Sequence, residues 1–131
     1  MVTIDSNIAV YAFSDAGSKS RIAFDAIGRA DFISVQVLNE FANVASRKQR
    51  RSWPEIASKI ADIRFAVGRV IPIEEAASTD AVRIAERYQL AFYDALLLAV
   101  ALAGGAKTIY SEDMQHGLVI DGTLRIVDPF R

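Results

Sequence analysis

The sequence of 131 residues contains no cysteine and a single histidine, His116. The absence of cysteine excludes disulfide bonds, thiolate nucleophiles, iron–sulfur clusters and cysteine-bound zinc. One histidine is too few for a histidine-rich zinc site, and no histidine other than His116 could serve in a Ser–His–Asp triad. Any chemistry must therefore rest mainly on carboxylates, amides, hydroxyls and lysine.

The chain also lacks an excess of one charge and a long apolar run. Fifteen basic and 16 acidic residues give a net charge of −1, so a polyanionic partner would need a local basic patch. The most apolar stretch, residues 95–106, is shorter than the roughly 20 residues of a membrane-spanning helix. Asp5 lies where a signal peptide would need its apolar region. We therefore expect a cytoplasmic protein without a membrane partner.

No repeat, low-complexity segment or Pro/Gly/Ser-rich linker divides the chain, which predicts one domain over residues 1–131. Short β-branched runs alternate with longer helical patterns, and this order favours an α/β fold with a central parallel sheet of about five strands flanked by helices. The expected strands are Val2–Ile4, Phe32–Val35, Val70–Ile73, Thr108–Tyr110 and Arg125–Val127. The expected helices are Lys19–Arg29, Val37–Lys48, Trp53–Val67, Glu75–Tyr88 and Phe92–Ala103.

Acidic residues follow two of the expected strands. Asp5 comes directly after Ile4, and two residues separate Asp113 from Tyr110. Parallel sheets bind ligands at the carboxyl ends of their strands, so both carboxylates reach one rim if these strands are neighbours. Asp94 is the only charged residue in residues 91–106, the most apolar helix and its ends. Burying its charge requires the helix dipole or a cation.

A fourth acid, Glu40, lies at the edge of the apolar stripe of its helix. Each acid also has an ordinary structural interpretation. Asp5 would cap the following helix, Asp94 would be a first-turn residue favoured by the helix dipole, Asp113 would hold a turn, and Glu40 would be solvated. Gathered at one rim, however, carboxylates raise one another's pKa unless a cation lies between them. Oxygen ligands without histidine or cysteine favour Mg²⁺ or Mn²⁺.

Four stretches in a fixed order resemble the PIN-domain ribonucleases, specifically the small VapC-type toxins of prokaryotic toxin–antitoxin pairs. They are TIDSNIAVYAF at 3–13, VLNEFANVASRK at 37–48, YQLAFYDALLLAVALAGGAKTIYSEDMQHG at 88–117 and RIVDPF at 125–130. The resemblance runs nearly end to end and implies a three-layer PIN-like domain.

The resemblance also implies roles for individual residues. The catalytic set would be Asp5, Glu40, Asp94 and Asp113, of which Asp5, Asp94 and Asp113 would ligate Mg²⁺ or Mn²⁺. Asn7 and Ser111 match polar positions that support such a site. Glu112 is left out of the ligand set. Ala91 stands where many relatives have a serine, and the missing helix cap is worth around 1 kcal/mol.

The implied activity is endonucleolytic cleavage of structured RNA, such as a tRNA or rRNA loop, by a metal-activated water. It would leave 5′-phosphate and 3′-hydroxyl ends. The implied partners are a small antitoxin protein, which would insert a basic side chain among the carboxylates, and a second copy of the chain.

A basic cluster at one helix end is the candidate RNA contact, and its alternative is a solvated helix terminus. The cluster comprises Arg47, Lys48, Arg50 and Arg51. For His116, a packing or turn role is favoured over substrate contact. Three alternatives to a toxin stay open: an RNA-processing nuclease of the same fold, a metal-binding interaction module without activity, and, with a poor fit, a phosphatase or phospho-receiver. A phosphatase of the haloacid-dehalogenase type needs a second acid where Asn7 stands.

Overall fold

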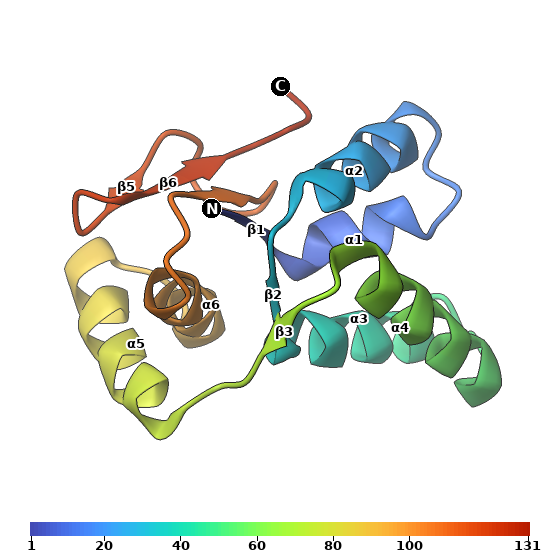
Figure 1. The fold of residues 1–131 in the computed structure, drawn as a ribbon, viewed down its shortest axis with the longest axis horizontal. Helices are drawn as coiled ribbons and strands as arrows, with labels where there is room; N and C mark the ends of the chain where they lie inside the picture. Colours follow the sequence, from blue (N-terminus) through green and yellow to red (C-terminus); the bar gives the residue numbers. More distant parts are fainter.

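Short apolar runs and capped helices alternate along the whole chain in the computed structural model, which describes residues 1–131 (Figure 1). The strands are β1 (Val2–Ile4), β2 (Ile33–Ser34), β3 (Val70–Ile71), β4 (Thr108–Tyr110), β5 (Val119–Ile120) and β6 (Leu124–Val127). The helices are α1 (Ser6–Ala12), α2 (Ser18–Arg29), α3 (Val35–Arg47), α4 (Trp53–Val67), α5 (Glu75–Tyr88) and α6 (Phe92–Ala103). The predicted α/β class is confirmed.

The central sheet has four strands in the order β1-β4-β6-β5, and its first three strands are parallel. β5 pairs antiparallel with β6. The prediction of about five strands in one parallel sheet was wrong in number and in pairing. β2 and β3 were expected to belong to the central sheet but form a separate two-stranded parallel sheet. Strand β5 was not predicted from the sequence.

The segment before β2 closes the outer edge of β1 instead of extending the sheet. The Val2 amide donates to the Asp31 carboxylate at 2.8 Å, and the Asp31 amide donates to the Val2 carbonyl at 2.8 Å. The Thr3 hydroxyl donates to the Phe32 carbonyl at 2.7 Å. These bonds occupy the edge before β2 begins, so β2 pairs with β3 farther along.

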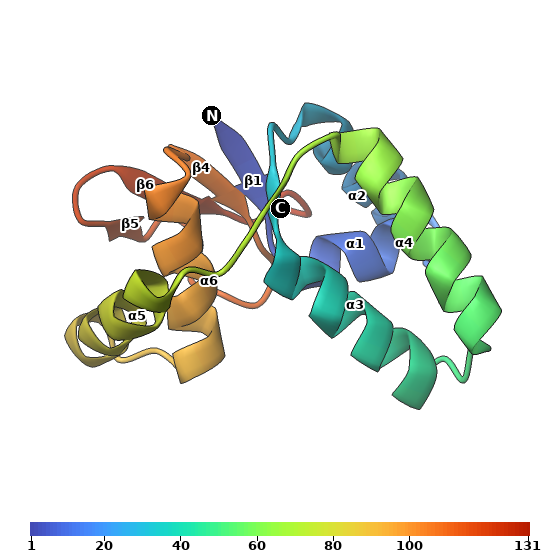
Figure 2. The same ribbon diagram turned by 60° about the horizontal axis from the view of Figure 1, so that its bottom comes forward.

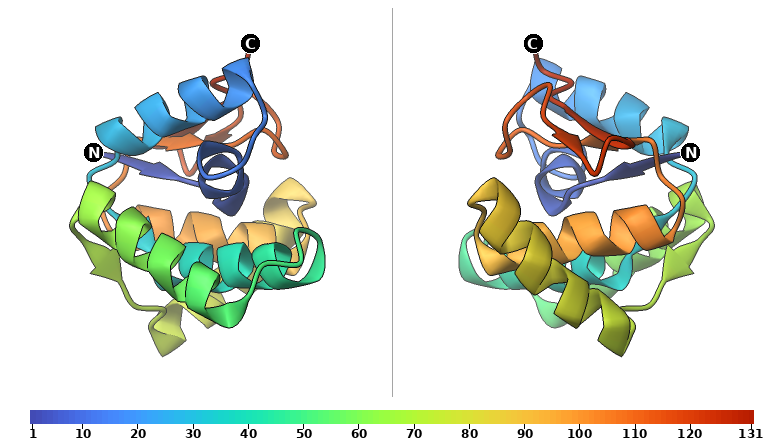
Figure 3. Two further views of the ribbon diagram at one scale, coloured as in Figure 1. Left: turned by 90° about the vertical axis from the view of Figure 1, so that its right-hand side faces the viewer. Right: turned by 90° about the vertical axis from the view of Figure 1, so that its left-hand side faces the viewer.

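Helices cover both faces of the sheet, as Figure 3 shows, with α2 on one side and α6 on the other. Residues 95–101 of α6 are all buried, which confirms the prediction of a buried central helix. α5 packs along α6, and α1 packs against α2 and α3. Figure 2 shows α1–α4 gathered on one side of the molecule, and the sheet with α5 and α6 on the other. No helix combines the length and the apolar character needed to cross a membrane.

Side-chain caps set several helix boundaries. The Ser34 hydroxyl accepts from the Gln36 amide, so α3 begins at Val35, two residues earlier than predicted. Ser52 and Glu55 form a reciprocal capping box at the start of α4. Ala91 precedes α6 and makes no side-chain cap, as its residue type predicts.

Gly104 ends α6 at a very close approach between elements. A Cβ atom there would lie 2.5 Å from Cζ of Phe32 and 2.9 Å from Cδ1 of Ile71. Glycine is therefore required by space, because the backbone at φ −78° suits any residue. This contact sets how closely α6 packs against the β2–β3 pair.

Candidate active site

The register of β1 and β4 brings two acidic segments to one edge of the sheet. Ile4 pairs with Tyr110, so Asp5 and the segment from Ser111 to Asp113 leave their strands side by side. The Asp5 amide continues the pairing with a 2.8 Å bond to the Tyr110 carbonyl. The expected adjacency of these strands is confirmed.

Asp5 is buried, with 5% of its surface exposed, and its carboxylate is held by several donors. One oxygen, Oδ1, accepts from the Ser6 amide at 2.6 Å. The other, Oδ2, accepts from the fully buried Ser111 hydroxyl at 2.7 Å and from Asn7 Nδ2 at 3.2 Å. Asp5 therefore caps α1, as its ordinary interpretation predicts, and it also has a fixed orientation at the sheet edge.

Asn7 joins Asp5 to Asp113. Its Nδ2 donates to Oδ2 of both carboxylates, at 3.2 Å to Asp5 and 3.0 Å to Asp113, while its Oδ1 accepts from the Glu112 amide at 3.3 Å. The uncharged Asn7 side chain thus holds the carboxylates of Asp5 and Asp113 close together but does not neutralise their charges. The structure thus places Asn7 and Ser111, the two residues expected to support the site, in hydrogen-bond contact with Asp5.

Glu40 on α3 and Asp94 in the first turn of α6 are the other two acids. Both are half-buried, and their carboxylates make no hydrogen bond shorter than 3.5 Å within the chain. Burial raises the pKa of Glu40, and the charge of Asp5 raises it further, an effect that the Ser6 hydroxyl opposes. Asp94 and Asp113 add smaller increases. Burial also raises the pKa of Asp94, with an added contribution from Asp113.

The pKa of Asp5 is raised by burial, an effect that the Ser111 and Ser6 hydrogen bonds oppose. Asp94 and Asp113 raise it further. The four acids therefore lie within electrostatic range of one another. Because their charges repel, a bound cation would lower the pKa values that the site raises.

The four acids do not form a closed metal cage. No three carboxylate or histidine side chains lie close enough together to hold one ion between them. The donor set nevertheless fits Mg²⁺, which keeps several waters and is bound through one or two carboxylates plus substrate phosphates. Asp5 and Asp94 are suited to this role, with Asp113 beside them.

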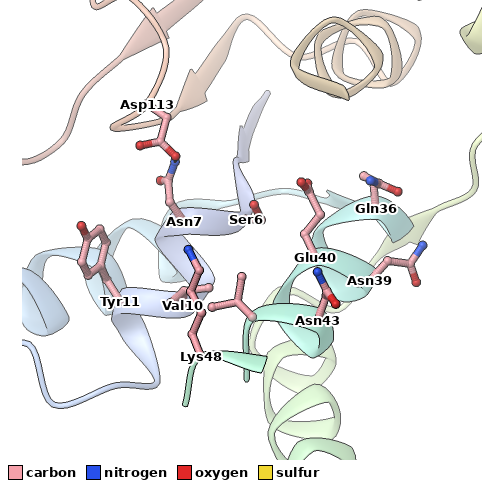
Figure 4. A pocket seen from close by; sticks show the side chains of 11 residues that line it. Ser6, Asn7, Val10, Tyr11, Gln36, Asn39, Glu40, Asn43, Lys48 and Asp113 are labelled. Atoms are coloured by element: carbon pink, nitrogen blue, oxygen red, sulfur yellow. The ribbon is translucent and has the colours of Figure 1, made fainter. Parts of the chain in front are cut away.

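A pocket of about 600 Å³ opens next to the acids, between α1 and α3 (Figure 4). Only three of its eleven lining residues are hydrophobic. The lining residues are Ser6, Asn7, Val10, Tyr11, Gln36, Asn39, Glu40, Asn43, Val44, Lys48 and Asp113. Two of the expected catalytic acids, Glu40 and Asp113, belong to this lining.

The predicted basic cluster is divided in the structure. Lys48 lines the pocket, whereas Arg47 and Arg50 are exposed outside the lining. Arg51 donates to the Phe13 carbonyl at 2.6 Å and to Gln49 Oε1 at 3.0 Å, so its guanidinium ties the α3–α4 connection to the end of α1. Contact with RNA stays a prediction for these residues.

An ion pair beside Asp113 was not expected from the sequence. Lys19 Nζ lies 2.7 Å from Glu112 Oε1 and stacks over the rings of Tyr11, at 4.8 Å, and Phe130, at 5.1 Å. The hydrogen bond from Lys19 holds the pKa of Glu112 below its usual range. The pair joins residues 93 positions apart, so no local spacing could have indicated it.

His116 has the turn role favoured from the sequence. Its Nδ1 accepts a 3.0 Å hydrogen bond from the Asp128 amide, which ties the loop after β4 to the segment after β6.

The family model of the PIN domain matches residues 2–117. The chain belongs to the PIN domain family. No curated protein matches the sequence significantly.

Solved structures share this PIN fold at low identity. A toxin–antitoxin complex from Klebsiella pneumoniae aligns with a TM-score of 0.69 and 21% identity, covering 98% of each chain. VapC20 of Mycobacterium tuberculosis, described as a toxin that cleaves the sarcin–ricin loop, aligns at 0.69 and 17% identity, over 86% of this chain and 92% of that one. VapBC2 of Rickettsia felis, bound to a promoter DNA fragment, aligns at 0.69 and 18% identity, over 98% and 100%.

Proposed function

We propose that this PIN domain is a Mg²⁺- or Mn²⁺-dependent endoribonuclease and acts as the toxin of a toxin–antitoxin pair. The observation that carries the proposal is the arrangement of acids at the end of β1 and β4. There Asp5 is buried and Asn7 bridges it to Asp113, while Glu40 and Asp94 lie within electrostatic range.

Some residues of the site would bind the metal, and others would orient these ligands. Asp5 and Asp94 would hold the metal, Asp113 would hold a metal-bound water, and Asn7 and Ser111 would fix the orientation of Asp5. When bound, the metal would lower the pKa of a coordinated water and neutralise charge that develops on the scissile phosphate.

Glu40 is the candidate proton acceptor. Its carboxylate makes no hydrogen bond shorter than 3.5 Å within the chain, it lines the pocket beside the acids, and burial raises its pKa toward the range in which a general base works well.

The toxin role is supported by the similarity in fold to toxins and toxin–antitoxin complexes, together with the motifs that run through nearly the whole chain. We therefore propose structured RNA of the tRNA or rRNA class as substrate. We also propose a small antitoxin as partner, with a basic side chain directed at the carboxylates, and a homodimer as the assembly.

The first experiment measures metal binding without any assumption about the RNA. Mn²⁺ is titrated into wild type, Asp94→Asn and the surface control Asp62→Asn while the melting temperature is followed. Saturation at about 100 times the dissociation constant stabilises the fold by roughly 2.7 kcal/mol. We expect this shift in wild type and in the control, and its loss in Asp94→Asn.

The second experiment tests cleavage. Wild type and Asp5→Asn are incubated with total bacterial RNA and Mn²⁺, and the cleavage ends are mapped. We expect 5′-phosphate ends from wild type only. A thermal shift without cleavage would favour the interaction module, and cleavage that persists in Asp5→Asn would refute the assignment of the site.

A further inference from the structure

One wall of the pocket beside the acids carries amides that are not engaged within the chain. Gln36, Asn39 and Asn43 share a face of α3 with Glu40, at helical spacings of three and four residues. The short hydrogen bonds of Gln36 and Asn43 pass through their backbone atoms, which leaves their side-chain amides open to a ligand. The side chain of Asn39 is exposed at the same wall.

The opposite wall differs. There the Asn7 amide is fully used, because it donates to Asp5 and Asp113 and accepts from the Glu112 amide. Lys48, which follows the last residue of α3, has no carboxylate within 4.0 Å, and Figure 4 shows its side chain directed toward Asn7. The pocket therefore has open amides beside Glu40 on α3, and Lys48 at the C-terminal end of the same helix, beyond Asn43.

This combination matches the chemistry of an unpaired nucleotide. An amide offers a donor and an acceptor to the edge of a base, and a lysine ammonium pairs with a phosphate. The pocket has a volume of about 600 Å³, in the range of ligand-binding clefts, and is open to solvent. Double-stranded RNA is instead contacted across its wide, shallow minor groove, which a concave pocket does not fit.

We propose that the pocket between α1 and α3 binds unpaired RNA nucleotides next to the cleavage position, with Asn39 and Asn43 contacting base edges and Lys48 contacting a phosphate. The inference rests on the proposed ribonuclease function, because it takes the neighbouring acids as the place of cleavage. It adds residues that would set the sequence preference of the enzyme.

The test measures binding in metal-free buffer, so that no cleavage occurs. Fluorescently labelled octamers of adenylate, cytidylate and uridylate are titrated with wild type, with Asn39→Ala/Asn43→Ala and with Lys48→Ala, and anisotropy is followed from 10 to 200 mM salt. The controls are Ser58→Ala, an exposed polar residue on α4, and Lys107→Ala, an exposed lysine just before β4.

We expect wild type and both controls to prefer one octamer, and the double variant to lose that preference by roughly fivefold for each amide contact removed. Lys48→Ala should keep the preference but reduce the slope of log affinity against log salt by about 0.7. A duplex of the preferred sequence should compete poorly.

Three results would overturn the inference: no binding of any octamer at 10 mM salt, an unchanged preference in the double variant, or the same salt slope in Lys48→Ala as in wild type. These results are independent of the proposed activity. If Mn²⁺ shifts the melting temperature of wild type but the pocket variants bind the octamers as wild type does, nucleotide binding by the pocket is refuted and the proposed nuclease function is not. If the pocket variants bind differently and Mn²⁺ has no effect on the melting temperature, the proposed nuclease function is refuted and nucleotide binding by the pocket is not.

Discussion

Replacing Ser111 with alanine removes the hydroxyl that holds the buried Asp5 carboxylate. The Ser111 side chain is fully buried, donates to Asp5 Oδ2 at 2.7 Å and accepts from the Met114 amide at 3.3 Å. A hydrogen bond to a charged group contributes about 1.5–3 kcal/mol, and no water can replace a donor that is buried this deeply. The longer bond to Met114 adds less. We expect Ser111→Ala to lower the free energy of unfolding by about 2–3 kcal/mol.

Urea denaturation followed by circular dichroism measures this loss, with Ser58→Ala on the exposed face of α4 as the matched control. The midpoint should fall with the slope unchanged, because the surface exposed on unfolding stays the same. Repeating Ser111→Ala in the Asp5→Asn background should give a smaller loss, since the acceptor is then neutral. A loss within about 0.5 kcal/mol of the control, or an equal loss in both backgrounds, would refute the bond's role.

Three further predictions concern other contacts. Asn7→Ala should weaken Mn²⁺ binding by about 10- to 100-fold in the thermal-shift titration; unchanged affinity would show that its bridge does not orient the acids. Arginine hydrogen bonds lower the pKa of Asp121 below 3.8, so its contribution to stability is present above that pH and lost as the pH falls through the folded pKa. Asp121→Asn should therefore have a lower melting temperature than wild type at pH 7, by the small amount typical of exposed pairs, and this difference should shrink as the pH falls below 3.8; a pH-independent difference would contradict this. Gly104→Ala should destabilise by about 1–3 kcal/mol because its Cβ would meet the Phe32 ring, whereas Gly28→Ala in α2, where a Cβ has open space, should stabilise by about 0.5–1 kcal/mol; the reverse order in urea melts would contradict the packing.

The sequence could predict the elements because local physics defines them. Helices α4, α5 and α6 begin and end at the residues predicted from the sequence, although only α4 has a side-chain cap. Strand pairing is not local. β2 pairs with β3 because residues 31 and 32 already occupy the edge of β1, and a two-residue strand such as β5 has too short a pattern to be seen.

In the candidate site, too, the features set by local sequence could be predicted and those that depend on distant contacts could not. Asp5 and Asp113 could be placed at one rim because parallel strands share their direction. The bridge through Asn7 and the ion pair of Lys19 with Glu112 depend on side-chain positions after folding, so no spacing predicts them. The sequence also could not show that the guanidinium of Arg51, a member of the predicted basic cluster, contacts the Phe13 carbonyl at the end of α1.

The closed edge of β1 bears on how the protein behaves at high concentration. An open edge strand presents unpaired amides and carbonyls that can template intermolecular β-structure. Here the carboxylate of Asp31 and the backbone of residues 31 and 32 cover one edge of the sheet, and the other edge ends in a strand of only two residues, β5. Neither side of the sheet therefore offers a long ladder to another molecule, and the fold resists edge-to-edge aggregation.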